Sequence, residues 1–239
     1  MRFTPPLAEA ILERRYKRFL ADAVTAEGER FTLHCPNTGS MRGCAEPGMR
    51  IWYSRSDNPK RKYAETWELA ETAAGARIGI HTGRANALVA EALDAGLLPE
   101  LAAWPERRAE VRIDDSRVDF LLGADAGDDC VVEVKSVTLL GADGLGLFPD
   151  ARSERARRHL ELLAERARGG RAAALIYCVQ HTGIERVAPA DDIDPGYGEA
   201  LRAALDAGVI VRALAAEIGP EELVLRRSLP VLPQGRMDP

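Results

Sequence analysis

The sequence predicts a small β-barrel over residues 1–82 followed by an α/β sandwich over residues 83–239. Two observations predict this division. Short alternating segments bounded by turn residues fill residues 8–80. After Gly83, helical spacing of apolar residues alternates with apolar runs typical of strands. With 239 residues, of which 46% are hydrophobic and 29% charged, the chain is long enough to bury a core in each part.

The first part contains segments that indicate five short strands. The apolar and β-compatible stretch 11–24 is followed by a turn at Glu27–Glu29 and a return strand at Arg30–His34, and residues 49–54 and 64–69 alternate. The residues from Pro36 to Ser40 have the composition of a loop. Among barrels of five short strands, the oligonucleotide-binding (OB) barrel is the commonest that suits this length.

The second part predicts the order α-β-β-β-α-β, which is that of an α/β sandwich. Thr82 can cap the first helix and Gly96 can end it, while the second helix repeats its apolar residues at helical spacing. The near-continuous apolar run at 172–180 is typical of a central strand covered on both faces. The expected elements are helices at 84–93, 152–168 and 197–207 and strands at 109–113, 117–122, 130–135, 172–180, 209–215 and 223–226.

The charge is distributed unevenly along the chain. The whole chain has a formal net charge of −5, but residues 1–90 hold 14 Lys and Arg against 10 Asp and Glu. The first part is therefore basic, and the remainder is strongly acidic, which favours an anion such as DNA as a partner of the first part. The residues expected to contact nucleic acid are Arg14, Arg15, Lys17, Arg18, Arg42, Lys60, Arg61 and Lys62, with Arg155 and His159 from the second part.

Aromatic residues are also concentrated in the first part, which holds eight of the thirteen, including Trp52, Tyr53, Tyr63 and Trp67. Rings beside basic groups can stack on the bases of a single strand. The alternative is that these rings belong to the barrel core, and for any single ring this interpretation is favoured.

The composition also indicates the cellular compartment of the protein. The chain has no apolar run of the roughly 20 residues that cross a bilayer and no apolar core of a signal peptide near Met1. Its four cysteines lack CxxC spacing, and a metal site at His34, Cys35 and Cys44 would have few and irregular ligands. We therefore expect a cytoplasmic protein with reduced, mostly buried thiols and no membrane contact. A homodimer is a hypothesis that the sequence does not test.

Three charged residues on two neighbouring strands carry the clearest chemical signal. Asp119 lies on the strand at 117–122, and Glu133 and Lys135 lie on the strand at 130–135, where they share one face because side chains alternate. Two converging carboxylates can hold a divalent cation, Mg²⁺ or Mn²⁺, against a phosphate, with a lysine beside the attacking water. The alternative for the Glu-x-Lys triplet is an exposed ion pair on a solvated face. However, both residues interrupt an otherwise apolar strand, where a charge requires a partner.

These three residues, in this order of elements, resemble the PD-(D/E)xK nuclease superfamily. The whole chain is similar to the sugar fermentation stimulation protein A family. The stretches that carry this similarity include Arg15–Asp22, His34–Met41, Arg61–Tyr63, Thr66–Leu69, Val118–Leu122, Glu133–Lys135, Phe148–Asp150, His159–Leu160 and Asp194–Pro195. The resemblance implies an N-terminal OB barrel joined to a nuclease-like domain, in a DNA-binding protein linked to the regulation of sugar metabolism.

The resemblance also implies roles for individual residues. Asp119 and Glu133 match the metal carboxylates of the superfamily and Lys135 matches its lysine, so the three are the expected catalytic residues. Glu91 on the preceding helix matches a further metal carboxylate, with a solvated helix charge as the alternative, and Gln180 is either a site residue or a strand-end amide. The family pattern after the Phe-Pro-Asp stretch has Arg-Gly-x-Lys-His, whereas this chain has Arg155-Ala-Arg-Arg-His159. Positive charge is kept there, and arginine binds phosphate well.

Three functions follow as hypotheses, and the sequence leaves open whether the protein is an enzyme. The first is a DNA-binding protein of low sequence specificity that cleaves phosphodiesters with a divalent metal. The second is a non-catalytic DNA-binding regulator of sugar metabolism genes that keeps the nuclease fold as a scaffold. The third is a metabolic enzyme acting on a phosphate or sugar ligand. No helix-turn-helix pattern is present, so we expect little base-specific readout.

Overall fold

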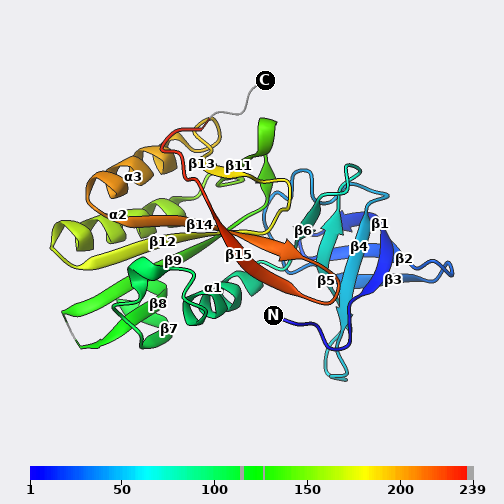
Figure 1. Ribbon diagram of the computed structural model, residues 1–239. Helices are drawn as coiled ribbons and strands as arrows, with labels where there is room; N and C mark the ends of the chain where they lie inside the picture. The colour runs from blue at the N-terminus through cyan, green and yellow to red at the C-terminus, as the bar shows by residue number, and fades with distance from the viewer. Residues whose placement is uncertain (114–115, 126, 236–239) are drawn as a thin grey trace.

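The computed structural model describes residues 1–113, 116–125 and 127–235. Its first part is a barrel of antiparallel strands, and its second part is a mixed sheet covered by helices on both faces (Figure 1). The predicted fold class, an OB-type barrel followed by an α/β sandwich, is confirmed.

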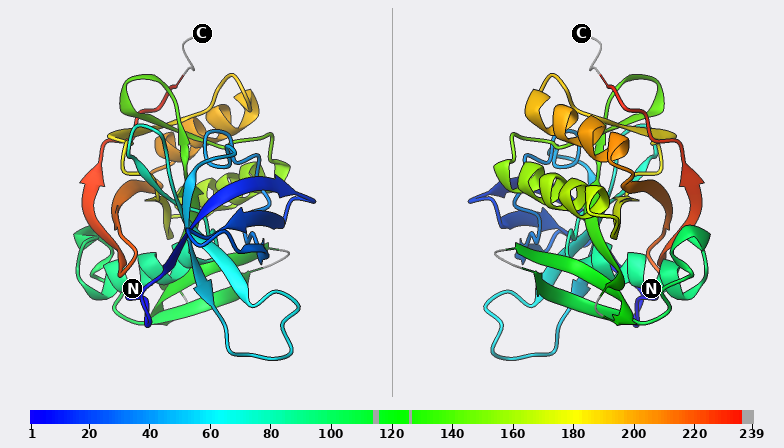
Figure 2. Two further views of the ribbon diagram at one scale, coloured as in Figure 1. Left: turned by 90° about the vertical axis from the view of Figure 1, so that its right-hand side faces the viewer. Right: turned by 90° about the vertical axis from the view of Figure 1, so that its left-hand side faces the viewer.

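The barrel consists of five strands in the order β3-β2-β1-β4-β5, and a pairing of His34 with Thr66 closes β3 against β5. A sixth strand, β6, pairs with β5 outside this ring. Figure 2 shows the barrel strands from one side of the molecule. The bounds are Ala8–Tyr16 (β1), Leu20–Val24 (β2), Arg30–His34 (β3), Arg50–Arg55 (β4), Glu65–Glu71 (β5) and Arg77–Gly79 (β6).

The barrel core takes most of the large apolar side chains of this region. Trp67 is fully buried and Trp52 is 4% exposed, while Tyr53 packs its ring on Phe31. The two tryptophans are thus core residues rather than stacking rings for nucleic acid, as the core interpretation of each single ring predicted.

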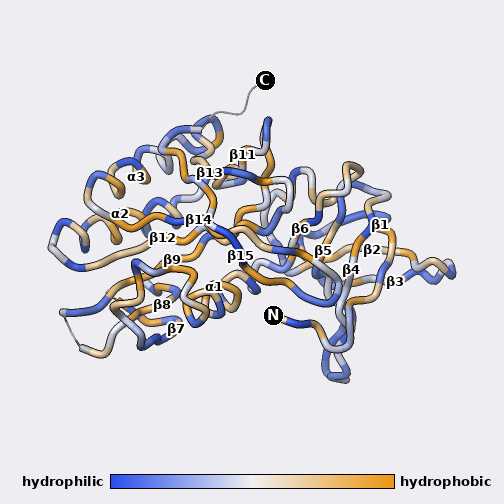
Figure 3. Tube along the Cα trace, in the orientation of Figure 1, coloured by the Kyte–Doolittle hydropathy of each residue, from blue (hydrophilic) through white to orange (hydrophobic). Residues whose placement is uncertain are grey.

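The second part has a six-stranded sheet in the order β15-β14-β12-β9-β8-β7, in which β9, β12 and β14 run parallel. The apolar residues that Figure 3 shows along β9 and β12 face two separate cores. Its strands are Arg107–Ile113 (β7), Ser116–Asp125 (β8), Asp128–Val137 (β9), Ala172–Val179 (β12), Ile210–Ile218 (β14) and Leu223–Leu229 (β15).

Three helices cover this sheet. Helix α1 (Arg84–Asp94) packs on one face, and α2 (Glu154–Arg168) and α3 (Pro195–Asp206) pack side by side on the other. The predicted cap of α1 is wrong, because Gly83 is the N-cap and Thr82 donates its hydroxyl to the Pro36 carbonyl instead (3.0 Å).

A small three-stranded sheet in the order β10-β11-β13 was not predicted. Its strands, Leu139–Leu140 (β10), Leu145–Phe148 (β11) and Arg186–Pro189 (β13), have two to four residues each. Runs this short carry no readable alternation. Two short 3₁₀ turns, Pro99–Leu101 and Ala142–Gly144, complete the elements.

The barrel and the sheet domain share one apolar core. Leu7, Trp52 and Leu69 of the barrel pack in the same cluster as α1 and the sheet face beneath it. Backbone hydrogen bonds also join the two parts, from Gly79 to Gln180 (2.8 Å) and from Thr182 to Arg77 (2.9 Å). The barrel therefore sits against the sheet domain through both packing and backbone pairing.

Candidate active site

Glu133 is the centre of a buried charged cluster on the sheet face beneath α2. Its side chain is only 5% exposed, and its Oε1 lies 2.5 Å from both Lys135 Nζ and His159 Nδ1. Lys135 is the next residue on the same face of β9, as the alternation of the strand predicted. His159 reaches the cluster from α2, whose apolar residues anchor that helix on the sheet.

The surroundings of Glu133 keep it charged. Burial would by itself raise its pKa, but the hydrogen bond to His159 and the positive charge of Lys135 outweigh this and hold the pKa below its usual range. Below this cluster, the buried hydroxyls of Tyr177 and Tyr197 form a hydrogen bond of 2.7 Å, and Phe148 packs against both rings. Glu133 is thus an ionised carboxylate in a largely dry environment.

Asp119 lies on β8 where this strand diverges from β9. The antiparallel register pairs Phe120 with Val132, so Asp119 falls opposite Glu133. The Asp119 carboxylate accepts a hydrogen bond from the backbone N–H of Val134 (2.8 Å) and another from Asn86 Nδ2 of α1 (2.7 Å). The side chain thereby replaces a strand partner for β9 and is fixed from two sides.

The charge of Asp119 is poorly compensated. Burial and the negative charge of Glu133 raise its pKa, and these outweigh the hydrogen bonds from Val134 and Asn86 and the charge of Lys135. Both of its hydrogen-bond donors are neutral groups, whereas Glu133 has a cation at hydrogen-bond distance. A further positive charge would therefore be favourable beside Asp119.

The donor set of these two residues suits a hard divalent cation. Carboxylate oxygens are the ligands that Mg²⁺ prefers, and Mg²⁺ sites commonly use one or two carboxylates completed by waters and substrate phosphates. In the part of the chain that the structure describes, no group of three or more His, Cys, Asp or Glu side chains is arranged to hold a metal. Asp119 and Glu133 would thus supply only part of a coordination shell.

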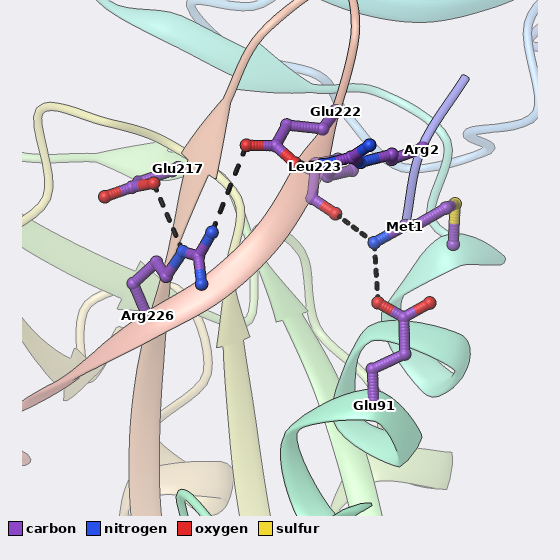
Figure 4. Close-up of polar contacts among 7 residues, drawn as sticks. All are labelled: Met1, Arg2, Glu91, Glu217, Glu222, Leu223 and Arg226. Atoms are coloured by element: carbon purple, nitrogen blue, oxygen red, sulfur yellow. Dashed lines mark hydrogen bonds and ion pairs between the residues drawn. The ribbon is translucent and has the colours of Figure 1, made fainter. Parts of the chain in front are cut away.

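Glu91 is not brought to this site. Its carboxylate binds the N-terminal ammonium of Met1 at 2.6 Å, and that ammonium also donates to the Leu223 carbonyl (Figure 4). Glu91 follows Asn86 by five residues, which turns the two side chains about 140° apart around the helix axis at 3.6 residues per turn. The structure therefore does not place Glu91 with Asp119 and Glu133, and its carboxylate pairs with the N-terminus instead.

His159 has a different place from the one predicted. It was expected on a basic helix flank that contacts nucleic acid, together with Arg155. The structure buries His159 to 7% exposure against Glu133, while Arg155 is exposed to solvent. Because its Nδ1 lies beside the Glu133 carboxylate, His159 is a positioning residue rather than a surface contact.

Several of the predicted nucleic-acid contacts are engaged within the barrel. Arg14 pairs with Asp22 (2.8 Å), and Arg61 donates to the Thr66 hydroxyl (2.8 Å). Arg15 donates from Nη2 to the carbonyls of Asn37 (2.9 Å) and Gly39 (3.1 Å), so it orders the loop at 36–40 instead of reaching outward. Lys17, Arg18, Arg42, Lys60 and Lys62 are exposed.

The loop at 36–40 connects the barrel to the sheet domain. Asp150 accepts hydrogen bonds from the backbone N–H (2.8 Å) and the hydroxyl (2.9 Å) of Ser40. A β-carbon at Gly39 would lie 2.6 Å from the Asp150 carboxylate, so any other residue at this position would displace that carboxylate. This contact between the domains was not predicted, although the composition of residues 36–40 did predict a loop.

A polar cavity of about 210 Å³ lies beside this contact. It is lined from the barrel loop by Asn37, Thr38 and Gly39 and from the sheet domain by Thr82, Ser136, Thr138, Leu139, Leu147, Phe148 and Asp150. Ser136 follows Lys135 on β9 and accepts a hydrogen bond from the fully buried Gln180 (2.9 Å). Gln180 therefore supports the cavity wall and does not contact the Glu133 cluster through a described hydrogen bond.

Comparison with known proteins assigns the chain to a family. The model for the SfsA N-terminal OB domain matches residues 14–80, and the model for the sugar fermentation stimulation protein RE domain matches residues 83–222. This chain belongs to the sugar fermentation stimulation (SfsA) family. No described helix is both long and apolar enough to cross a membrane.

Individual members of the family match nearly the whole chain. The sugar fermentation stimulation protein homolog of Alkalilimnicola ehrlichii is 57% identical over 97% of this chain and 99% of its own length, and that of Halorhodospira halophila is 56% identical over 90% of each. The solved structure of Pyrococcus furiosus SfsA in complex with Ca²⁺ has a TM-score of 0.86 and 27% identity, covering 97% of this chain and 98% of that one.

Proposed function

We propose that this protein binds DNA with little sequence specificity and hydrolyses phosphodiester bonds with Mg²⁺ or Mn²⁺ held by Asp119 and Glu133. The observation that carries the proposal is the pair of carboxylates on adjacent strands, of which Asp119 has only neutral hydrogen-bond donors among the described residues. The description of the P. furiosus family member as a Ca²⁺ complex supports divalent binding in this fold.

Each residue of the cluster has a role in this proposal. A bound divalent ion would polarise a phosphate oxygen and lower the pKa of a bound water. Lys135 would orient the attacking water or offset the charge that develops on the phosphate. His159 holds the Glu133 carboxylate from the side of α2, and Asn86 holds Asp119 from α1. Preorganised groups of this kind act without reorganisation during the reaction.

One observation favours a second function, a DNA-binding regulator without catalysis. Glu133 Oε1 already lies 2.5 Å from two nitrogen atoms, so part of its charge is compensated without a metal ion. In that case the barrel would bind DNA, and the cluster would only stabilise the sheet domain. The family name is compatible with a role in regulating sugar metabolism genes.

A cleavage assay with matched variants tests the proposal. The wild type, Asp119→Asn and Glu91→Gln are incubated with plasmid, linear duplex and single-stranded DNA in Mg²⁺ or Mn²⁺. We expect Asp119→Asn to cleave at least about a hundredfold more slowly, since a metal ligand supplies several kcal/mol of transition-state stabilisation. Glu91→Gln removes a carboxylate from the same region without touching the site and should cleave as the wild type does. Equal cleavage by wild type and Asp119→Asn on every substrate would refute the catalytic role.

A further inference from the structure

The turn between β1 and β2 presents an exposed ring between cationic side chains. Phe19 is 50% exposed, more than the other large apolar side chains found exposed, such as Leu140 at 39% and Leu205 at 36%. Lys17 and Arg18 precede it and are both exposed. Phe31 and Phe148 pack on other aromatic rings, whereas no such ring contact of Phe19 is found among the described residues.

The backbone of this turn is held in an unusual conformation. Lys17 has a φ of 49° and Arg18 a φ of 65°, in the left-handed region that glycine or asparagine occupies at lower cost. Strained residues of this kind persist where the surrounding structure determines them, and they concentrate at functional sites. Lys17 and Arg18 occupy these two positions although glycine would adopt the conformation at lower cost. The turn therefore has two positive charges and a strained backbone.

The turn is also fixed in place from several sides. Arg15 donates to the Arg18 carbonyl (2.7 Å), Arg18 donates to the Thr38 carbonyl (3.0 Å), and the Phe19 carbonyl accepts from the backbone N–H of Cys35 (2.8 Å). These contacts fix the backbone that carries the exposed Phe19 ring, so little backbone entropy is lost when a ligand packs on this turn.

These contacts fasten the turn to the loop at 36–40, which lines the polar cavity. The cavity in turn includes Ser136 at the end of β9, the strand that carries Glu133 and Lys135. The turn that carries Phe19 is therefore connected, through the loop at 36–40 and the cavity wall, to the strand of the candidate active site.

We propose that Phe19 stacks on an unpaired base, with Lys17 and Arg18 contacting the adjoining phosphates, so that the protein prefers single-stranded to duplex DNA. This proposal rests on the proposed DNA binding. Stacking requires a base whose face is accessible, which a duplex provides only at its ends. The two cations give the turn the charge complementary to a nucleic-acid backbone, in a chain whose overall charge is negative.

Binding measurements on the full chain test this inference. The affinity for a fluorescein-labelled oligo(dT) and for a duplex of equal length is measured by fluorescence anisotropy at fixed salt, with EDTA present to prevent cleavage. We expect Phe19→Ala to weaken oligo(dT) binding roughly five- to hundredfold, the range found for the loss of one stacked base, and to change duplex binding much less. Leu205→Ala, which removes an exposed apolar side chain from α3, should leave both affinities unchanged.

A fluorescence change reports the stacking itself. In Phe19→Trp the new indole is exposed, whereas Trp52 and Trp67 are buried and Trp104 is partly buried on the sheet domain, so oligo(dT) should quench this variant more than it quenches the wild type. Lys17→Ala should lower the salt slope of oligo(dT) binding by about 0.7, as expected for the loss of one phosphate contact on a single strand.

The outcomes separate this inference from the proposed function. If the wild type binds neither DNA, both are wrong. If the wild type binds DNA but Phe19→Ala binds oligo(dT) equally well, or loses both substrates equally, the stacking inference alone is overturned. Unaltered quenching in Phe19→Trp would likewise contradict it.

Discussion

The charges of the barrel and those of the sheet domain are compensated in different ways. On the barrel, exposed arginines pair with carboxylates of other strands, such as Arg14 of β1 with Asp22 of β2 and Arg30 of β3 with Glu13 of β1. In the sheet domain, Glu133 is buried with Lys135 and His159, and the described residues place no cation at hydrogen-bond distance from Asp119 opposite. Exposed pairs are screened by water and contribute little, while a buried charge depends on each of its partners. The buried cluster around Glu133 is therefore expected to contribute more to stability than the exposed pairs of the barrel.

The largest effect is expected from removing the lysine of the buried cluster. Lys135→Met should destabilise the protein by about 3 kcal/mol, because it leaves the buried Glu133 carboxylate without its cation. The double variant Glu133→Gln/Lys135→Met should recover at least half of this loss, since both charges are then absent. Chemical denaturation of the two variants and the wild type measures the difference.

Arg30→Met is the matched control on the barrel, since it removes an exposed cation from its pair with Glu13. It should leave the unfolding midpoint nearly unchanged. A loss of stability in Arg30→Met as large as that in Lys135→Met would remove the distinction between the two regions.

A smaller effect is expected at the contact that joins the two regions. Asp150→Ala removes the acceptor of two hydrogen bonds from Ser40 and should cost about 1–2 kcal/mol. Protection of the Ser40 amide from hydrogen exchange should fall in the same variant, because its backbone donor loses its partner. Asp206→Ala on the exposed end of α3 serves as control. Unchanged exchange at Ser40 in Asp150→Ala would show that the loop is held without this contact.

The smallest effect is expected from pH at the junction of barrel and sheet. His181 is buried, its Nδ1 accepts a hydrogen bond from the Gly183 N–H (3.0 Å), and burial lowers its pKa. The imidazole of His181 therefore binds a proton more readily in the unfolded chain than in the folded one. The contribution of His181 to stability is present above its ordinary pKa of about 6.5 and decreases as the pH falls below that value.

His181→Asn cannot take up a proton and should lose less thermal stability than the wild type between pH 7.5 and 5.5. Melting temperatures at both pH values measure this. An equal decrease in the two proteins would exclude His181 as a source of acid sensitivity.

Much of the fold could be predicted because it depends on local patterns. The long strands and all three helices repeat their apolar residues with the expected period, and the shared face of Glu133 and Lys135 follows from strand alternation alone. The short strands β10, β11 and β13 were missed because their pairing is set by tertiary contacts. The prediction of Thr82 as the N-cap of α1 was wrong for a similar reason, since its hydroxyl donates to the carbonyl of Pro36, which is distant in sequence.

The candidate site was predictable only in part. The position of a residue in the sequence does not determine where the end of a long side chain lies. Glu91 was therefore predicted beside Asp119 and Glu133, although its carboxylate binds the N-terminus. Arg15 was counted as a phosphate contact although it holds the loop at 36–40. His159 could have been assigned to Glu133 only if the height of α2 above β9 had been known.

The placement of the Met1 ammonium has a consequence for protein maturation and engineering. Because this group binds both Glu91 and the Leu223 carbonyl, the chain start is a structural ligand that fastens α1 to β15. N-terminal acetylation or a fused tag would remove its charge. A protein fused through its N-terminus therefore lacks this ammonium, whereas one tagged at its C-terminus keeps it.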